Sequence, residues 1–405
     1  MHQSRPRVAM LVRNPYTHDT RVEKEARTLR DAGYDVTVVA EAADDLPLRE
    51  ARDGIGIVRV PRPWPNVPLI RFVRYAVALR RALVDAGPDI LHAHDSDALG
   101  AIAGAARELH APFIYDAHDL WLGRPRRGRS RLYFALNQLW YRWIEERRLP
   151  RAAAHITVSP PIARHLERRY RLDNVDLVPN YPERDSVATQ PASLRELPGG
   201  SAIPADAPIV LYLGALMAER GLEHLVAAMR QVRSPAHLVL LGAGGLAPVL
   251  LRQAQREGIG DRVHVMGPIP SERVAAYAAS ATIGVSPIVA SCLNYRYSLP
   301  NKLFQYMAAG LPVIASDFPQ VREVVEGSGA GWCVDTSRSD VVAAAIDSAL
   351  EDPARARAAG EAGRRAVVER FHWEVAADTL LSVYRRVTEL RSGGPSARPP
   401  PARRG

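Results

Sequence analysis

The stretch SLPNKLFQYMAAGLPVIAS, residues 298–316, joins a helix-forming run to a short apolar strand. Ser298 is a residue type that caps helix starts, and Gly310 is typical of a helix end. We therefore expect a helix over residues 299–309 and a strand over residues 312–316. Helix–strand units of this kind, repeated along a chain, build parallel sheets covered by helices.

The same alternation extends outward from this stretch to nearly the whole chain. Short β-branched apolar runs alternate with amphipathic stretches of helical length, which predicts an α/β fold. Residues 183–207 interrupt the pattern, because they are polar and rich in Pro, Gly and Ser, as interdomain connections are. The predicted fold class is two Rossmann-like doubly wound domains joined by a hinge. The predicted strands lie at 8–12, 35–40, 56–60, 89–94, 112–117, 155–159 and 175–180, and then at 209–215, 237–244, 262–267, 283–288, 312–316 and 331–335.

This pattern gives a provisional domain map. We place an N-terminal Rossmann-like domain at residues 1–185, an interdomain linker at 186–207 and a C-terminal Rossmann-like domain at 208–368. A C-terminal helix is expected at 369–390, and the Pro-, Gly- and Arg-rich residues 391–405 are expected to be a disordered basic tail. Ligands of such sheets bind beyond the carboxyl ends of the strands, so the residues that follow each strand are the first candidates for ligand binding.

The composition excludes several classes of protein. Hydrophobic residues make up 47% and charged residues 24% of the chain, as in soluble folded proteins. Two cysteines, Cys292 and Cys333, are too few for a disulfide framework, and the N-terminus has no signal-peptide pattern, so we expect a cytoplasmic location. The longest uncharged stretch, residues 274–295, contains Pro and several polar residues and would span a bilayer poorly.

The net charge of +9 is concentrated in two segments. Residues 124–151 carry nine arginines against two glutamates, and the tail 391–405 carries four arginines and no acidic residue. The rest of the chain is therefore close to neutral, which argues against a protein that coats nucleic acid.

Residues 124–151 also interleave arginines with aromatic and aliphatic side chains at helical spacing, Trp140 and Trp143 among them. An amphipathic helix of this kind fits an anionic membrane surface, where a lipid-linked acceptor would be found. A helix packed on the core with solvated arginines explains the pattern equally well. Binding of RNA ranks lower, since no nucleic-acid module is recognisable.

The start of the helix at 299–309 has the features of an anion site. Its first turn contains no carboxylate, and it offers backbone amides, the Asn301 amide and the Lys302 ammonium, which suit a phosphate or diphosphate. A second cation lies at the matching place after the first strand of the same half, where Gly214 ends the strand and Arg220 begins a helix. Each feature alone also fits a packed helix with a surface cation, but the two together favour an anion.

Several stretches carry a family resemblance. The second half resembles the nucleotide-binding half of glycosyltransferase family 4 in GALMAERGLEHLVAAM, VHVMGPIPSERVAAYAASATIGVSPI and SLPNKLFQYMAAGLPVIASDFPQVREVVE. The first half is similar to the acceptor domain of that family in HDTRVEKEARTLRDAGYDVTVVA and PDILHAHDSDALGAIAGAARELHAPFIYDAHDLW. Residues 370–387 resemble the closing helix that returns to the first domain. The resemblance implies the GT-B fold, with two domains facing across a cleft, and retaining sugar transfer.

The resemblance also implies roles for residues. The family holds the donor diphosphate with an arginine and a lysine, whose places are taken here by Ala215 and Arg220. It carries two glutamates with seven residues between them, which correspond to Tyr297 and Gln305 and which read the donor sugar and the ribose. His118 resembles the family histidine that reaches toward the donor sugar, and backbone around Gly267 and Ile269 would face the base. The predicted catalytic residues are His118, Arg220 and Lys302; the predicted donor-binding residues are Gly214, Ile269, Tyr297, Ser298, Asn301, Leu303 and Gln305; Arg21, His94, Asp95 and Asn294 are predicted on the acceptor or sugar side.

Other patterns imitate different chemistry. Asp95 and Asp97 match an acid-x-acid metal signature, but Asp97 is expected to cap the helix that follows it. His92 and His94 share one strand face and could hold zinc in a metal-dependent hydrolase, which the hinge argues against, because such enzymes are usually single barrels. Residues 240–246, LLGAGGL, lack the third glycine of a dinucleotide fingerprint. We expect neither metal nor cofactor.

The predicted function is retaining transfer of a sugar from a nucleoside diphosphate sugar to a hydroxyl acceptor on a glycan, a lipid-linked molecule or a natural product. The partners are the donor, the acceptor and an anionic membrane surface on the cytoplasmic side, and no nucleic acid is expected. A sugar-nucleotide epimerase, or a binding subunit with reduced catalysis, remains an alternative on the same fold.

Overall fold

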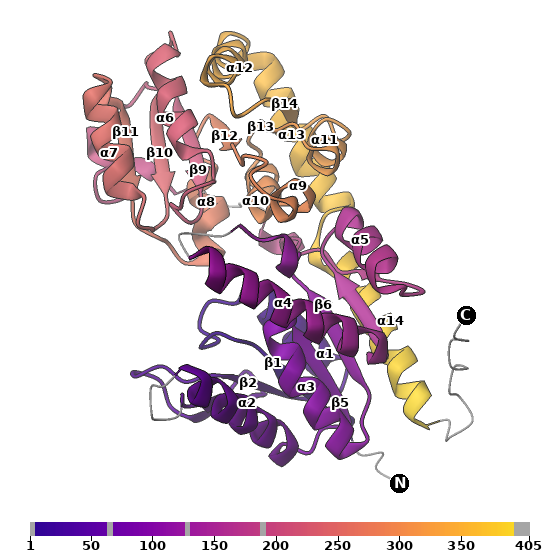
Figure 1. Ribbon diagram of the computed structural model, residues 1–405. Coiled ribbons are helices and arrows are strands. Elements are labelled where there is room, and N and C mark those ends of the chain that lie inside the picture. Colours follow the sequence, from indigo (N-terminus) through magenta and orange to yellow (C-terminus); the bar gives the residue numbers. More distant parts are fainter. Residues whose placement is uncertain (1–4, 63–67, 126–129, 187–191, 393–405) are drawn as a thin grey trace. The chain divides into compact units, whose positions relative to one another are not determined.

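The computed structural model describes residues 5–62, 68–125, 130–186 and 192–392. Most of the predicted tail, part of the predicted linker and four residues of the basic segment lie outside these described residues. The chain divides into two compact units (Figure 1). The first unit takes the chain up to Pro179 and again from Ala376 on, and the second is Asn180–Val375.

The first unit is built on an eight-stranded sheet in the order β3-β4-β2-β1-β5-β6-β7-β8. Neighbouring strands are parallel except for the antiparallel pair β3–β4. The strands are β1 (Arg7–Leu11), β2 (Asp35–Glu41), β3 (Arg49–Arg52), β4 (Ile55–Val60), β5 (Ile90–His94), β6 (Phe113–Ala117), β7 (Ala154–Thr157) and β8 (Asp176–Leu177). The helices are α1 (Thr20–Asp31), α2 (Pro68–Asp85), α3 (Ser96–Leu109), α4 (Arg131–Arg148), α5 (Pro160–Tyr170) and α14 (Trp373–Ser392), the last belonging to this unit from Ala376.

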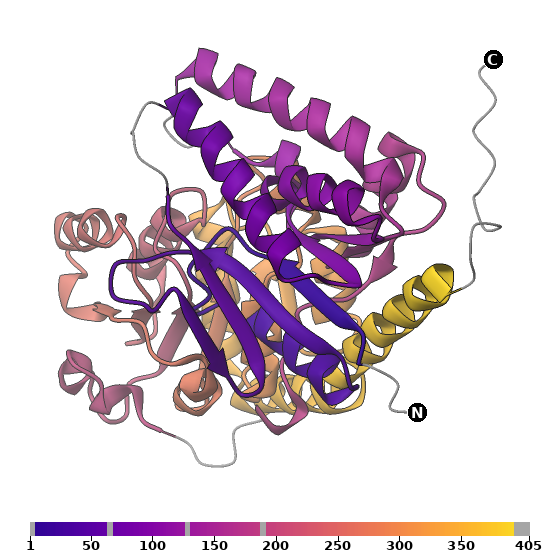
Figure 2. The same ribbon diagram turned by 90° about the horizontal axis from the view of Figure 1, so that it is seen from below.

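Three helices of the first unit lie side by side in the order α2, α3, α4 (Figures 1 and 2). Helix α3 packs on β5 and β6, and both α2 and α4 pack on α3. Helix α14 joins the same unit through its buried residue Tyr384, whose hydroxyl lies 2.8 Å from His92 Nδ1, and through ion pairs of Arg386 with Asp176 and of Arg391 with Asp89.

The second unit has a six-stranded, fully parallel sheet in the order β11-β10-β9-β12-β13-β14. Its strands are β9 (Ile209–Leu213), β10 (His237–Leu241), β11 (Val263–Met266), β12 (Ile283–Ser286), β13 (Val313–Ser316) and β14 (Gly331–Val334). Its helices are α6 (Leu222–Gln231), α7 (Ala247–Arg256), α8 (Val274–Ala278), α9 (Leu293–Tyr297), α10 (Asn301–Ala308), α11 (Pro319–Val325), α12 (Ser339–Glu351) and α13 (Pro353–Glu369).

The sheet of the second unit is buried on both faces, as its continuous apolar strands require. Along β9, Ile209, Leu211 and Leu213 join one hydrophobic cluster, and Val210 and Tyr212 join the cluster on the opposite face. This alternation follows from the two-residue repeat of a strand. Helix α10 packs in the first cluster, so its start is held beside the carboxyl ends of the strands.

The predicted class, two Rossmann-like doubly wound domains, is confirmed, and every predicted strand overlaps an observed one. Strand β3 was not predicted, because its sequence REAR is polar and pairs only at the sheet edge. The units separate at Pro179, earlier than the predicted position after residue 185. The described part of the predicted linker packs on the second unit, because Leu194 and Ile203 are buried in its core.

Candidate active site

The second unit fixes Lys302 by locking helix α10 onto the sheet. The Tyr306 hydroxyl donates to the carbonyl of Val285 at 3.0 Å and accepts from the amide of Leu213 at 2.8 Å. Gly284 makes room for this ring, because a Cβ at that position would lie 2.4 Å from Tyr306 Cγ. The start of α10 therefore has a defined position relative to the ends of β9 and β12.

Lys302 is buried, yet its ammonium has no carboxylate partner among the described residues. Its Nζ lies 3.5 Å from the centre of the Tyr212 ring, a cation–π contact. Burial, with the charge of Arg220 adding to it, holds the pKa of the Lys302 ammonium well below its usual range. Gly214 has a φ of 115°, and a Cβ there would come within 3.6 Å of Nζ, so glycine leaves space beside the ammonium. The site thus holds a cation without a counter-ion.

Arg220 lies close enough to Lys302 to repel it, as was expected of two cations at one sheet edge. Its guanidinium packs over the Tyr295 ring at 5.0 Å, and no described carboxylate pairs with it. The residue directly after it is tightly constrained: Gly221 has a φ of 72°, and a Cβ there would overlap the Pro287 carbonyl oxygen at 1.7 Å. Only glycine fits that position, so the loop presents Arg220 in one orientation.

The glycines within residues 240–246 allow two loops to pack closely. A Cβ on Gly242 would lie 2.1 Å from the Gly214 carbonyl oxygen, and one on Gly244 would lie 2.1 Å from the Leu216 carbonyl oxygen. These glycines let the loops after β9 and β10 touch, which supports the interpretation that they are not a dinucleotide fingerprint. Gly267 and Ile269 follow β11, two strands away from Gly214 in the sheet.

The start of α10 differs from the prediction in two respects. Helix α10 begins at Asn301, and Ser298 instead ends the short helix α9, where its hydroxyl donates to the carbonyl of Tyr295. The side chain of Leu303 lies in the core and its amide donates to the Pro300 carbonyl, so Leu303 offers no free donor. The amides of Asn301 and Lys302 have no acceptor among the described residues and remain open to an anion.

The remaining predicted donor-side residues lie around the same helix starts. Tyr297 is the last residue of α9, and Gln305 lies one turn after Lys302; both side chains are half-buried. Asn294 is buried. None of these residues is a carboxylate, and among the described residues the charge that acts on the pKa of Lys302 is that of Arg220.

The first unit holds a second cluster, centred on Asp116 in β6. Asp116 Oδ2 accepts from Arg21 Nη2 at 2.7 Å and lies 3.3 Å from His118 Nε2. His94 Nδ1 lies 3.1 Å from the same His118 nitrogen. Arg21 also pairs with Glu25 at 3.0 Å and donates to the Val178 carbonyl, so its guanidinium is fully engaged and buried. Arg21, predicted on the acceptor or sugar side, therefore holds Asp116 in place.

The pKa values of His94 and His118 shift in opposite directions. Burial alone would lower the pKa of His118, but the carboxylates of Asp116 and Asp95 raise it to about 9. Burial lowers the pKa of His94, which stays neutral. The pKa of Asp116 lies well below its usual range despite burial, because Arg21 and His118 favour its charged form. His118 is thus a cation at neutral pH, and it is the one histidine of this cluster that is partly exposed.

The cluster also has the composition of a metal site. Ligand atoms of Glu25, His94, Asp116 and His118 lie within 4.8 Å of one another. The Arg21 guanidinium, however, already contacts both carboxylates and supplies the positive charge that a metal ion would bring. His92, which shares a strand face with His94, turns Nδ1 toward Tyr384 instead. We assign no metal to these residues.

Asp95 and Asp97 also differ from the prediction. Helix α3 begins at Ser96 with Asp95 at its N-cap, so Asp97 is not the cap. Asp95 Oδ1 accepts from the His118 amide at 3.0 Å, and Oδ2 pairs with Arg124. Asp95 thereby positions the His118 loop. Asp97 is half-buried beside Arg13, and burial raises its pKa to about 7.

Helix α4 carries most of the basic segment 124–151. Its buried residues are Tyr141, Ile144 and Glu145, while Leu132, Leu136 and Leu139 are 70%, 59% and 62% exposed. Core packing therefore accounts for one side of the helix only. Among the described helices, none combines the length and the apolar character needed to cross a membrane.

Comparisons with known proteins match both units. A model described as Glycosyltransferase Family 4 matches residues 19–181, and a model described as Glycosyl transferases group 1 matches residues 207–352. The chain is similar to the D-inositol 3-phosphate glycosyltransferase of Xylanimonas cellulosilytica, with 31% identity over 54% of this chain and 51% of that protein. It is similar to the phosphatidyl-myo-inositol mannosyltransferase of Mycobacterium leprae, with 26% identity over 92% of this chain and 95% of that protein.

Solved structures give the same result for the fold. Sucrose-phosphate synthase from Thermosynechococcus elongatus superposes with a TM-score of 0.80 at 23% identity, over 95% of this chain and 100% of that one. Anabaena HepE in complex with UDP and glucose superposes with a TM-score of 0.71 at 16% identity, over 96% of this chain and 100% of that one. The fold is thus that of the GT-B glycosyltransferases.

The chain belongs to glycosyltransferase family 4. It spans between half and two thirds of the length of the first curated relatives that it matches.

Proposed function

We propose that the protein is a retaining glycosyltransferase that moves a sugar from a nucleoside diphosphate sugar to a hydroxyl acceptor. The observation that carries this proposal is the Lys302–Arg220 pair at the carboxyl edge of the second sheet, which has no carboxylate partner. A buried cation without a counter-ion is costly to keep. A bound diphosphate would remove that cost.

The chemistry needs these cations when the sugar–phosphate bond breaks. The leaving diphosphate gains negative charge while the anomeric carbon becomes positive, so fixed positive groups near the diphosphate lower the barrier. Lys302, Arg220 and the open amides of Asn301 and Lys302 supply that charge. They are held before the substrate arrives, because Tyr306 and Gly221 fix their elements.

The donor would extend along the sheet edge from this pair toward β11. Gly214 and Gly267 follow strands that lie two places apart in the sheet, a separation of roughly 10 Å at the usual spacing of strands. That distance suits a nucleotide with its diphosphate at Lys302 and its base at Gly267 and Ile269. The relatives include enzymes named for GDP-mannose and a structure in complex with UDP-glucose, so both bases belong in a screen.

The donor sugar would be held without the two family glutamates. Tyr297 and Asn294 replace the first as hydrogen-bonding groups, and Gln305 can still bind a ribose diol through its amide. In the first unit, His118 remains a candidate catalytic residue; its side chain is cationic, and Asp95 holds its loop. No metal takes part in this proposal.

We further propose that the protein contacts an anionic membrane surface through α4. The exposed leucines of this helix, together with Arg131, Arg142 and Arg147, form the amphipathic face that such surfaces bind. A lipid-linked acceptor would be met there.

The test is turnover with a panel of UDP- and GDP-sugars, with and without hydroxyl acceptors, using the wild-type protein and the Lys302→Met variant. Methionine keeps the apolar stem and removes only the charge. We expect transfer with retained anomeric configuration, and a loss of at least a hundredfold in turnover for the variant, which is the scale of one lost charge-stabilising donor. Product formed without acceptor would indicate an epimerase, binding without turnover would indicate a binding subunit, and full activity of the variant would remove Lys302 from the mechanism.

A further inference from the structure

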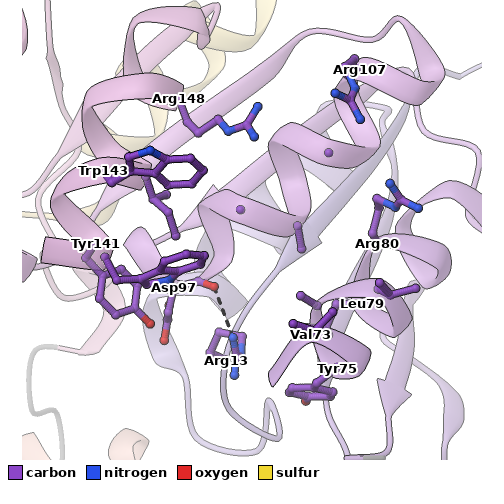
Figure 3. A pocket seen from close by; sticks show the side chains of 17 residues that line it. Arg13, Val73, Tyr75, Leu79, Arg80, Asp97, Arg107, Tyr141, Trp143 and Arg148 are labelled. Atoms are coloured by element: carbon purple, nitrogen blue, oxygen red, sulfur yellow. Dashed lines mark hydrogen bonds between the residues drawn. The ribbon is translucent and has the colours of Figure 1, made fainter. Parts of the chain in front are cut away.

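The first unit contains a cavity of about 360 Å³ that the proposed transfer chemistry does not use. Its walls come from α2 and α4, and its floor is α3 (Figure 3). A cavity of this size lies within the range of small-ligand sites. Since α2 and α4 both pack on α3, the space between them is a groove that runs along α3.

Two glycines of α3 keep this groove open. A Cβ on Gly100 would touch only Ile144, at 4.0 Å, and one on Gly104 would lie 3.0 Å from the Arg80 side chain. Glycine inside a helix costs about 1 kcal/mol relative to alanine. An alanine at position 100 would fit without a clash, so the missing side chain preserves space at a cost to the helix.

The walls are apolar although they face solvent. Val77 is 50% exposed, Trp140 is 43% exposed and Trp143 is 41% exposed. The rings of Trp140 and Trp143 stack at 5.5 Å. A hydrocarbon chain bound in the groove would cover these exposed apolar side chains.

The charges are separated along the groove. Arg107, Arg148 and Arg80 gather toward one end, and Asp97 lies toward the other beside Arg13 (Figure 3). Arg80 pairs with Glu108 at 3.6 Å and Arg13 with Glu41 at 2.9 Å. Arg107 and Arg148 pair with no described carboxylate. Burial, followed by the charges of Arg151 and Arg107, lowers the pKa of Arg148, so Arg107 and Arg148 lie close enough to repel each other. The groove therefore has a cationic end with two unneutralised guanidinium groups.

We propose that this cavity binds a membrane lipid phosphate, with the phosphate on Arg107 and Arg148 and the first part of the hydrocarbon chain between Val77, Trp143 and Ile144. Guanidinium groups bind phosphate through paired N–H donors, and the apolar walls match the chain. The two unpaired guanidinium groups lie at one end of the groove, which sets the direction of the ligand. The proposal rests on the membrane association proposed above and gives it a specific site.

A binding experiment without any sugar donor tests this proposal independently of transfer. The probe is geranyl phosphate, titrated calorimetrically into the full chain below its micelle concentration, with geraniol and inorganic phosphate as comparison ligands. We expect geranyl phosphate to bind at least tenfold more tightly than either comparison ligand. Equal affinity for inorganic phosphate would reduce the site to a surface anion patch and overturn the proposal, as would equal affinity for geraniol.

Variants separate the cavity from the surface of α4. Gly100→Leu fills the groove without changing charge, and Arg148→Gln removes one of the two unpaired cations; each should weaken binding of geranyl phosphate at least tenfold. Arg142→Gln is the matched control, because it removes the same charge from the same helix at a position outside the cavity. Circular dichroism shows whether each variant folds.

Vesicles of phosphatidylglycerol distinguish the lipid phosphate from a bilayer surface in general. Gly100→Leu should reduce co-sedimentation with vesicles that contain a prenyl phosphate while leaving binding to plain phosphatidylglycerol vesicles intact. Unchanged binding of geranyl phosphate by Gly100→Leu would contradict the proposal outright. Tight binding of RNA oligonucleotides that competes with geranyl phosphate would also contradict it, since the groove would then belong to another class of partner.

Discussion

Lys302 is unusual in this chain, because 51 of the 53 basic side chains are arginines and only Lys24 and Lys302 are lysines. Arginine is the default cation here, so a lysine at position 302 points to a local requirement. The centre of the Tyr212 ring lies only 3.5 Å from Nζ and limits the space on that side. A compact ammonium fits there, whereas a planar guanidinium is larger.

The unpaired charge of Lys302 predicts a conflict between stability and function. Lys302→Met removes a buried ammonium that lacks a counter-ion, so we expect the free energy of unfolding of the second unit to rise by about 1–3 kcal/mol. Thermal denaturation of the ligand-free proteins measures this change. A variant less stable than the wild type would mean that Lys302 supports the fold.

His118 predicts a pH dependence at the same scale. Its folded pKa of about 9 lies above the ordinary value of 6.5. The charged form therefore stabilises the fold fully below pH 6.5, and this contribution is lost as pH rises through about 9. If catalysis requires the cationic form of His118, turnover should also fall as the pH rises through about 9.

Asp95→Asn tests the origin of that pKa. The asparagine oxygen can still accept from the His118 amide, but the charge is gone, so the pKa of His118 should fall. Histidine NMR titration gives the pKa directly, and the upper limit of the turnover profile should move down with it. An unchanged titration would show that Asp95 contributes no charge to His118.

At the scale of elements, the fit between α10 and β12 positions Lys302 at the start of α10. Gly284→Ala would place a Cβ 2.4 Å from Tyr306 Cγ and push the ring away from the backbone groups of Leu213 and Val285. Overpacking of this kind typically costs about 1–3 kcal/mol. Urea unfolding should show the loss, together with weaker diphosphate binding. Gly245→Ala is the matched control, because a Cβ there meets nothing within 4 Å; an equal loss in both variants would contradict the account.

The sequence predicted elements well where the hydrophobic period was strong. The buried parallel strands are continuous apolar runs, which the pattern identifies directly. Strand β3 and helix α9 were missed, because one is a polar edge strand and the other has only five residues. The cap at Ser298 was misplaced, since α9 ends there and its hydroxyl is used by that helix.

At the scale of the whole molecule, the proximity of Arg220 and Lys302 could be predicted because both residues follow strands of one parallel sheet. The network around Asp116 could not, because Arg21 and Asp116 lie 95 positions apart in the sequence and nothing local marks them as an ion pair. The groove on α3 also escaped prediction, since it depends on glycines of one helix facing side chains of two others.

The central claim is that Lys302 gains its full positive charge when it binds a diphosphate, and the two lysines of the chain allow a direct measurement. Lysine labelled with ¹³C at Cε gives two resonances, which Lys24→Arg assigns, and their titration reports the Lys302 pKa with and without UDP, GDP or inorganic pyrophosphate. We predict a pKa well below 10.5 in the free protein and a marked rise when a nucleoside diphosphate is bound. An ordinary pKa in the free protein, or a Lys302 signal that no diphosphate shifts, would contradict the account.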